Sequence, residues 1–191
     1  MDGEEIGLLL RQERGQFLEF LSAYDYKKTS VPKPTEDLVR EIARLAGGMA
    51  NADGGTLLVG VEPDKSVTGI PHSPDALQEL IRAPGALLTP PLAPACRRAQ
   101  LGNLVLLKFE IASSPEVHRI AGGRAFYRLT TENPALPPDQ IQSLRGSKRN
   151  VFYERQNVLD ATGDDLDLEA VAALAEKIGD PRDPLSVLQR V

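Results

Sequence analysis

The chain has 191 residues and a mass of 20.7 kDa, which fits one domain with a short appendage and excludes a multi-domain machine. Hydrophobic residues make up 41% and charged residues 26%, so the composition is globular and excludes a chain that is disordered or fibrous throughout. The longest apolar runs, Leu8 to Leu10 and Leu104 to Leu107, are far shorter than the roughly 18 residues of a membrane span.

The N-terminal residues and the cysteine content predict a cytoplasmic protein. Asp2, Glu4 and Glu5 stand where a secretory signal carries basic residues before an apolar stretch. Cys96 is the only cysteine, so no disulfide can form within the chain. We therefore expect no membrane partner.

The net charge of -5 is unevenly distributed along the chain. Residues 1–90 carry a net charge of -5 and residues 156–191 also carry -5, whereas residues 91–155 hold ten basic and five acidic side chains, a net charge of +5. An acidic protein that binds anions does so through a local basic patch, and this middle segment is where we expect one. A solvated surface of mixed charge is the other interpretation.

The first part of the chain predicts a short amphipathic helix, a strand and a longer helix. Apolar spacings of three and four indicate a helix over residues 4–12, and the apolar and aromatic run 17–20 after Gly15 predicts a strand. The longer helix is expected to begin with Thr35 as its N-cap. Its buried face repeats at four, three and four residues, as Leu38, Ile42, Leu45 and Met49.

The rest of the chain predicts a mixture of helices and paired strands. In order, we expect a central strand over 56–61, a helix over 74–82 capped by Ser73, an extended proline-rich connection over 84–94, a hairpin with arms 95–101 and 104–111, a strand over 125–130 and a helix from 137 to about 149. This order predicts an α+β fold with a mixed sheet and flanking helices.

The composition changes after residue 155. Acidic residues from Asp160 to Asp167 precede an alanine-rich helix over 168–178. We therefore predict a core domain over 5–150 and an acidic helical appendage, or C-terminal helical tail, over 156–191.

Most catalytic signatures are absent from the sequence. His72 and His118 are the only histidines, and neither lies at a metal-ligand spacing to a cysteine or another histidine. No Gly-x-Ser-x-Gly elbow occurs, and the stretch 60–66 lacks the second glycine of a phosphate-binding loop. We therefore expect neither a metal site nor a cofactor.

A helix end, a glycine turn and a strand follow one another over residues 50–61. Asp53-Gly54-Gly55 supplies the positive φ values of a tight turn, and Gly60 allows another backbone or a ligand to approach closely. We assign a structural role to five residues of this motif: Asn51, Asp53, Gly54, Gly55 and Gly60. The alternative is that this segment only stabilises the fold and binds no ligand.

Together with other segments, this motif carries a resemblance to a known family. The matching segments are Leu18-Glu19-Phe20, Met49-Ala50-Asn51, Asp53-Gly54-Gly55, Gly60-Val61-Glu62, Gly69 and Phe126-Tyr127-Arg128. Over residues 13–149 the chain resembles the AlbA_2 or Schlafen-type domain family. The resemblance implies a domain that binds DNA or RNA, often in a bacterial transcriptional regulator or beside an ATPase module, and a possible homodimer.

Some eukaryotic relatives of that type are metal-dependent RNases, and the resemblance implies three carboxylates for the metal. Here Arg14 and Pro63 occupy two of the acid positions, and Leu21 occupies the position of a lysine. A nuclease would have to use the remaining candidates Glu13, Glu19, Glu62 and Asp64. We expect Glu19 instead to be structural, or to accept hydrogen bonds from the turn at Asp53-Gly54, and an enzyme is the less favoured interpretation.

The basic segment supplies the predicted nucleic-acid-binding residues. They are Arg119, Arg124, Tyr127, Arg128, Arg145, Lys148 and Arg149. Arg128 is the strongest single candidate, and Tyr127 or Phe126, but not both, can face outward from a strand to stack on an unpaired base. The cluster at 145–149 is also consistent with compensation of a helix dipole. No pattern for reading base edges occurs, so contacts to phosphates should dominate.

A non-catalytic interaction or dimerisation module is the main alternative. It would pair through a sheet edge, or the acidic stretch 160–167 would cover the basic surface. The second alternative is a weak nuclease that depends on a divalent metal.

Overall fold

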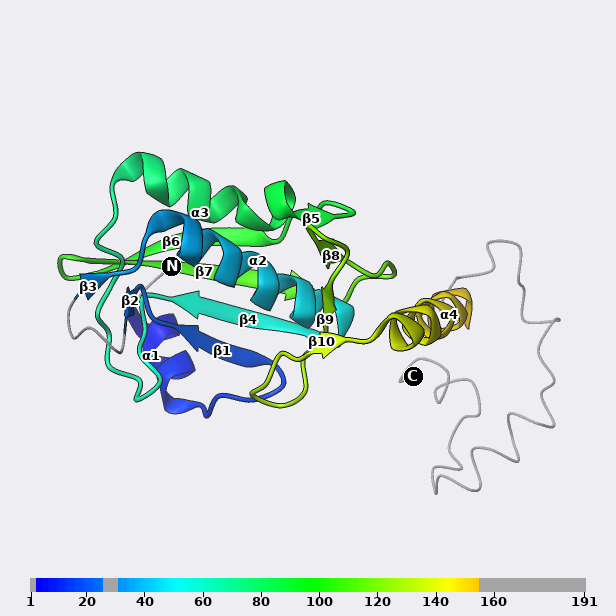
Figure 1. Cartoon of the computed structure of the whole chain (residues 1–191). Helices are drawn as coiled ribbons and strands as arrows, with labels where there is room; N and C mark the ends of the chain where they lie inside the picture. The colour runs from blue at the N-terminus through cyan, green and yellow to red at the C-terminus, as the bar shows by residue number, and fades with distance from the viewer. Residues whose placement is uncertain (1–2, 26–30, 155–191) are drawn as a thin grey trace, which may run out of the picture. The chain divides into compact units, whose positions relative to one another are not determined.

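The computed structural model describes residues 3–25 and 31–154 (Figure 1). The chain divides into two compact units, Met1–Val151 and Phe152–Val191. The first unit contains every β-sheet of the described residues. The appendage predicted over 156–191 lies outside the described residues. None of the described helices has the length and apolar character needed to cross a membrane.

A four-stranded mixed sheet forms the centre of the domain, with the order β1-β4-β7-β6. Strand β1 (Leu18–Leu21) runs parallel to β4 (Gly54–Val59), which pairs antiparallel with β7 (Leu104–Ala112). β7 forms the predicted hairpin with β6 (Ala95–Leu101), which is one of the two edge strands. The mixed sheet with helices on its faces confirms the predicted α+β class.

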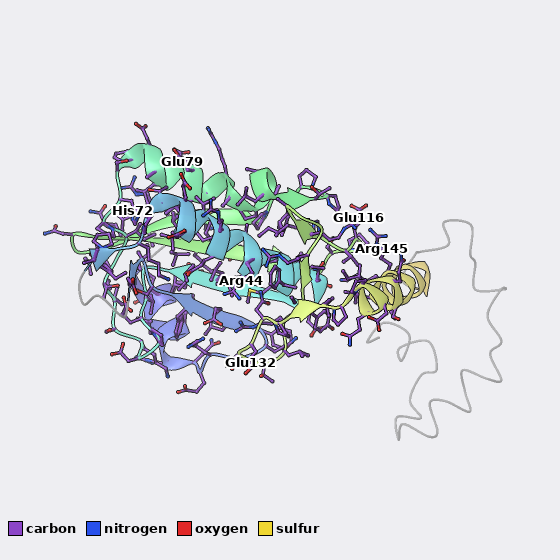
Figure 2. The ribbon with its side chains drawn as sticks, in the orientation of Figure 1. Arg44, His72, Glu79, Glu116, Glu132 and Arg145 are labelled. Atoms are coloured by element: carbon purple, nitrogen blue, oxygen red, sulfur yellow. The ribbon has the colours of Figure 1, made fainter. Side chains whose placement is uncertain are left out.

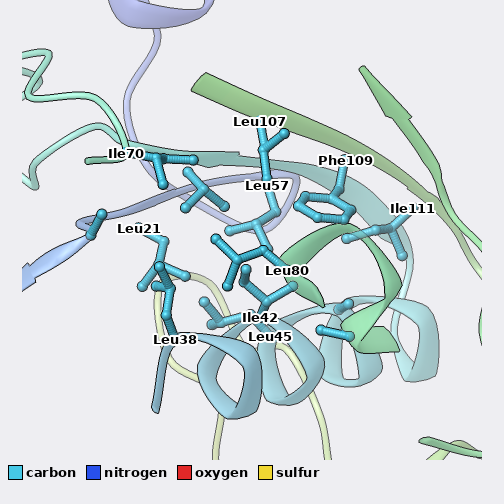
Figure 3. Packing of buried hydrophobic residues seen from close by; sticks show 14 of the residues in the cluster. Leu21, Leu38, Ile42, Leu45, Leu57, Ile70, Leu80, Leu107, Phe109 and Ile111 are labelled. Carbon is cyan, nitrogen blue, oxygen red and sulfur yellow. The ribbon is translucent and has the colours of Figure 1, made fainter. Parts of the chain in front are cut away.

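Helices cover both faces of this sheet. Helix α2 (Thr35–Asn51) packs against α3 (Pro74–Leu87), and their apolar side chains share one core with Leu57, Leu107 and Phe109 of the sheet (Figure 3). Helix α1 (Gly3–Arg11) packs against the other face through Ile6. Both faces of β7 are therefore buried, which explains why it is a nearly continuous apolar run.

Lys108 and Glu110 are the charged residues in that run, and Lys108 is the buried one. Its Nζ pairs with Glu5 of α1 and with Glu110 Oε1 at 2.6 Å. Burial alone would lower the pKa of Lys108, but the hydrogen bonds that its Nζ donates to Glu110 and Glu5 outweigh burial and raise that pKa. The same hydrogen bonds lower the pKa of both glutamates. This ion cluster attaches α1 to the sheet.

A second, smaller sheet lies beside the C-terminal half of α2. Its order is β10 (Ala135–Leu136), β9 (Ala125–Phe126), β8 (Arg119–Ile120) and β5 (Leu88–Thr89). The predicted strand over 125–130 is thus only two residues long, because the Arg128 N–H donates to the Gly48 carbonyl of α2 instead of a strand neighbour. A separate pair, β2 (Tyr24–Asp25) and β3 (Val31–Pro32), completes the described strands.

Helices α2, α3 and α4 each have a boundary that differs from the sequence prediction. Pro34, not Thr35, precedes the first turn of α2, and no side chain caps it. Ser73 caps α3 as predicted, by accepting from the Ala76 N–H at 3.3 Å. This helix continues past Pro84 to Leu87, and Pro84 lies on its buried face. Helix α4 (Pro138–Glu154) extends beyond the predicted end near residue 149.

Candidate nucleic-acid interface

The glycine turn after α2 has the structural role expected for it. Gly54 has φ 81°, and a Cβ there would lie 2.5 Å from the Ile111 carbonyl oxygen of β7. Gly60 has φ 96°, and a Cβ there would lie 3.1 Å from the backbone of Gly69. The Leu106 side chain is closer still, at 2.9 Å, so packing within the domain leaves no room for a side chain at Gly60.

Asn51 connects the end of α2 to the small sheet. Its Nδ2 donates to the carbonyls of His118 at 2.9 Å and Phe126 at 2.8 Å, and its Oδ1 accepts from the His118 N–H at 2.8 Å. The side chain is 1% exposed, so these bonds replace water for all three backbone groups. Asn51 therefore positions β8 and β9 against α2.

Arg128, the strongest sequence candidate, does not lie on the surface. Its side chain is 0% exposed, and its Nη1 forms an ion pair with Glu19 Oε2 at 2.6 Å. Its remaining donors bond to carbonyls within the domain, those of Gly15, Leu18 and Thr131. The prediction that Arg128 contacts phosphate is therefore wrong, because its donors are already used inside the protein.

Lys148 is also buried. Its Nζ donates to the carbonyls of Ser114 at 2.6 Å and Ala50 at 3.2 Å, which places a cation at the C-terminal end of α2. Burial lowers its pKa, and nearby Asp53 opposes that shift. The prediction of a phosphate contact is wrong here too, and the side chain of Arg149 lies outside the described residues.

The remaining candidates lie on two different faces of the small sheet. Arg119 is the register partner of Ala125, so their side chains share a face, and Ala125 packs with Ile141 near Leu144 of α4. Tyr127 lies two residues after Ala125 and so points to the same side; burial, and then the charge of Asp53, raise its pKa. Arg145 projects from α4 (Figure 2). Arg124 and Phe126 instead face the surface of α2.

That second face contains a hollow of about 380 Å³. Its lining comes from α2, the end of α3 and the β8–β9 hairpin: Arg40, Glu41, Arg44, Leu87, Ile120, Ala121, Arg124 and Phe126. Arg44 lies over the Phe126 ring, with its Cζ 5.8 Å from the ring centroid. We call this the α2–β9 hollow.

Arg40 and Arg44 were not among the binding residues predicted from the sequence. They lie four residues apart and so share one face of α2, a spacing that is visible in the sequence but also typical of an ordinary solvated helix. Phe126 and Arg124 come from a segment some 80 residues later. Only the contact between α2 and β9 brings these groups together.

The hollow has an uneven charge. Arg40 is held by Glu36 and Asp37 at 3.2 and 3.3 Å, and Glu41 is paired with Lys33 at 2.6 Å. Arg44 and Arg124 have no acidic partner within the described residues. The hollow therefore presents two cations that are available to an anion.

Comparisons with known proteins now place the domain. Residues 15–137, more than half of the chain, match the family model described as Schlafen, AlbA_2. The chain belongs to the Schlafen AlbA_2 family. No curated protein matches it in sequence.

Two solved structures resemble this Schlafen AlbA_2 domain. The crystal structure of the DIP2311 protein from Corynebacterium diphtheriae shares 15% identity at a TM-score of 0.54 over 76% of this chain. The chain spans only 28% of that protein, so the likeness concerns the fold. The solution structure of the N-terminal domain of a RecG-related, ATP-dependent DNA helicase-like protein from Nitrosomonas europaea shares 20% identity at a TM-score of 0.44, with 65% of this chain and 87% of that one covered.

The four acidic nuclease candidates of this Schlafen AlbA_2 domain do not converge. Glu62 accepts from Ser22 and Thr68 at 2.7 and 2.6 Å. Glu13 is exposed and pairs with Lys65, and Asp64 is exposed and bonds to Ser66 in its own turn. Among residues 3–25 and 31–154, no three acidic, histidine or cysteine side chains are grouped so that they could hold a metal.

Glu19 lies between two arginines. Arg14 Nε lies 2.6 Å from Oε1 as an ion pair without hydrogen-bond alignment, and Arg128 binds the other oxygen. Arg14, which stands where the resemblance implies an acid, thus neutralises the charge of Glu19. The expected structural role of Glu19 agrees with this arrangement, but its partner is not the turn at Asp53, whose carboxylate accepts from Gln16 at 2.8 Å.

Proposed function

We propose that this chain is a nucleic-acid-binding domain that contacts phosphates through Arg44 and Arg124 in the α2–β9 hollow. The observation that carries the proposal is that these two arginines share one hollow and have no acidic partner in the described part of the chain. Arginine is suited to phosphate because its planar fork donates two parallel hydrogen bonds. Arg119, Tyr127 and Arg145 lie on the α4 side of the small sheet, and we expect them to contribute less to nucleic-acid binding.

Membership of the Schlafen AlbA_2 family supports a domain associated with nucleic acids. The finer expectations of a transcriptional regulator, a homodimer and an ATPase partner stay predictions. The main sheet has two edge strands: β1, whose residues are all buried, and β6, which carries exposed Arg97 and Arg98 and would be the edge for dimerisation through the sheet. Charged side chains on an edge strand oppose pairing with a second copy, so we favour nucleic-acid binding over that alternative.

The test is a fluorescence-anisotropy titration of labelled DNA and RNA, single- and double-stranded, at about 50 and 200 mM salt. Binding should weaken with salt, and Arg44→Ala with Arg124→Ala should lower the slope of log affinity against log salt by about 0.7 per arginine on single strands. The matched control is Arg11→Ala with Arg97→Ala, because both residues lie on the α1 side of the main sheet. Equal losses in both double variants would contradict the proposed interface, and no binding at 50 mM would reject the function.

A further inference from the structure

The α2–β9 hollow contains more than phosphate recognition requires. Most of its exposed lining is apolar, contributed by Leu87, Ile120, Ala121 and Phe126. Phosphate oxygens are bound by hydrogen-bond donors and cationic side chains, so an apolar wall does not contribute to phosphate binding. Its volume of about 380 Å³ falls within the usual range for small-ligand pockets, about 300–1,000 Å³. An apolar wall next to free cations suits a ligand with a flat apolar part and an anionic part.

Phe126 supplies the flat surface. Its ring lines the hollow and is half-buried, so it is fixed in place but reachable. The Arg44 guanidinium lies over the ring, 5.8 Å from its centroid, which is within the range of a cation–π contact but wider than the roughly 3.5–4 Å of planes in contact. A base can therefore stack on this ring face only where the Arg44 guanidinium moves aside. Aromatic rings and arginine planes are the surfaces on which proteins stack unpaired bases.

Two arginines without an acidic partner in the described part of the chain line the hollow together with the ring. Arg124 is exposed in the β8–β9 turn, two residues before Phe126, and Arg44 projects from α2 (Figure 2). The other charged groups of the lining, Arg40 and Glu41, are each paired with residues of opposite charge. An anionic group is therefore attracted to the Arg44 and Arg124 end of the hollow.

We propose that the α2–β9 hollow is a subsite for one unpaired nucleotide, with the base against Phe126 and the apolar wall and the flanking phosphates on Arg44 and Arg124. The proposal rests on the nucleic-acid-binding function above and deepens it, because it specifies strandedness. A base within a duplex is stacked and paired, and so cannot present its face to Phe126. The domain therefore prefers single strands to a duplex of the same sequence.

The first experiment compares single-stranded and duplex oligonucleotides in anisotropy titrations of the whole chain. Phe126→Ala should weaken single-strand binding about five- to hundredfold and leave duplex binding unchanged, so that the preference disappears. Phe126→Leu keeps an apolar side chain without the ring and should lose most of the preference too. Phe17→Ala is the matched control, because Phe17 is 61% exposed and does not line the hollow.

A second measurement follows the bound base directly, first with the unaltered protein and then with Phe126→Leu. A single strand that contains 2-aminopurine should lose fluorescence when its base stacks in the hollow, and Phe126→Leu should remove this quenching at saturation. Binding without quenching, a preference for duplex, or equal single-strand affinity of the Phe126 variants would overturn the subsite and leave the phosphate interface standing. Failure of the unaltered protein to bind any nucleic acid would instead overturn the proposed function and the subsite with it.

Discussion

Two arginine sites in this molecule contrast sharply. Arg128 is buried with Glu19 beside it, and its donors are used by an ion pair and backbone carbonyls. Arg124 is exposed in a turn and has no acidic partner within the described ranges. The two residues are four positions apart in the same basic segment. A candidate for phosphate binding is thus identified by which donors remain free, and not by the local density of positive charge.

The largest expected effect comes from breaking the buried site. Arg128→Leu should lower the free energy of unfolding by about 3–5 kcal/mol, because it leaves a buried carboxylate with one partner fewer. Urea unfolding measures this, with Arg124→Ala as the control, which should change the free energy by less than about 0.5 kcal/mol. A similar cost for both variants would contradict the contrast between the two sites.

Asn51 links the buried core to the hollow. Asn51→Ala should cost about 1–3 kcal/mol of unfolding free energy, because three buried backbone groups of His118 and Phe126 lose their partner. It should also weaken single-strand binding, since Phe126 is then less firmly held. Thermal unfolding and anisotropy together test this, against Asn103→Ala in the exposed hairpin turn. Full affinity in a destabilised Asn51→Ala protein would show that the hollow does not depend on this support.

A smaller effect should distinguish the two faces of the small sheet. Arg124→Ala should weaken nucleic-acid binding severalfold at about 50 mM salt and reduce its salt dependence by about one phosphate contact. Arg145→Ala removes the same charge from α4 and should change both quantities less. Anisotropy titrations at several salt concentrations measure the difference. A larger loss for Arg145→Ala would move the interface to the α4 side.

The smallest effect is a pH dependence of stability, which arises on the face of the main sheet that α1 covers. Lys108 lowers the pKa of Glu5 and Glu110 below their ordinary value of 4.5. The unfolded chain then binds more protons than the folded one, so this stabilisation is present above about pH 4.5 and is lost as the pH falls through the lowered pKa values. In Lys108→Met, urea unfolding between pH 7 and 3 should show a shallower loss of stability. Nucleic-acid binding at pH 7 should stay unchanged, and an unaltered acid profile would contradict the role of the cluster.

Most of the fold was predictable because it depends on local signals. The helix at 35–51 follows from apolar spacing, the hairpin from Gly102-Asn103, and the turn at 53–55 from residues that tolerate positive φ. The family followed from the same local motifs and is confirmed over residues 15–137. The strand predicted over 125–130 was too long, because a contact with α2 takes the hydrogen bond that a strand neighbour would have received.

The candidate site was predictable only in part. Arg124 lies exposed in the β8–β9 turn, and its predicted role in binding stays a prediction. Arg128 and Lys148 carry the same charge in the same segment, and the sequence offered no sign that Glu19 and the Ser114 carbonyl would take their donors. Arg44 was missed because its partner in the hollow, Phe126, is 82 positions away.

The amino-acid sequence by itself determined the α+β class, the order of the main elements, the glycine turn and the family, since each depends on propensities and spacings within a few neighbouring residues. The tertiary structure alone decided which charged side chains are buried in pairs and which remain free. Burial and pairing of a charge depend on groups that folding brings together from distant parts of the chain: Glu19 reaches Arg128, and Arg44 reaches Phe126.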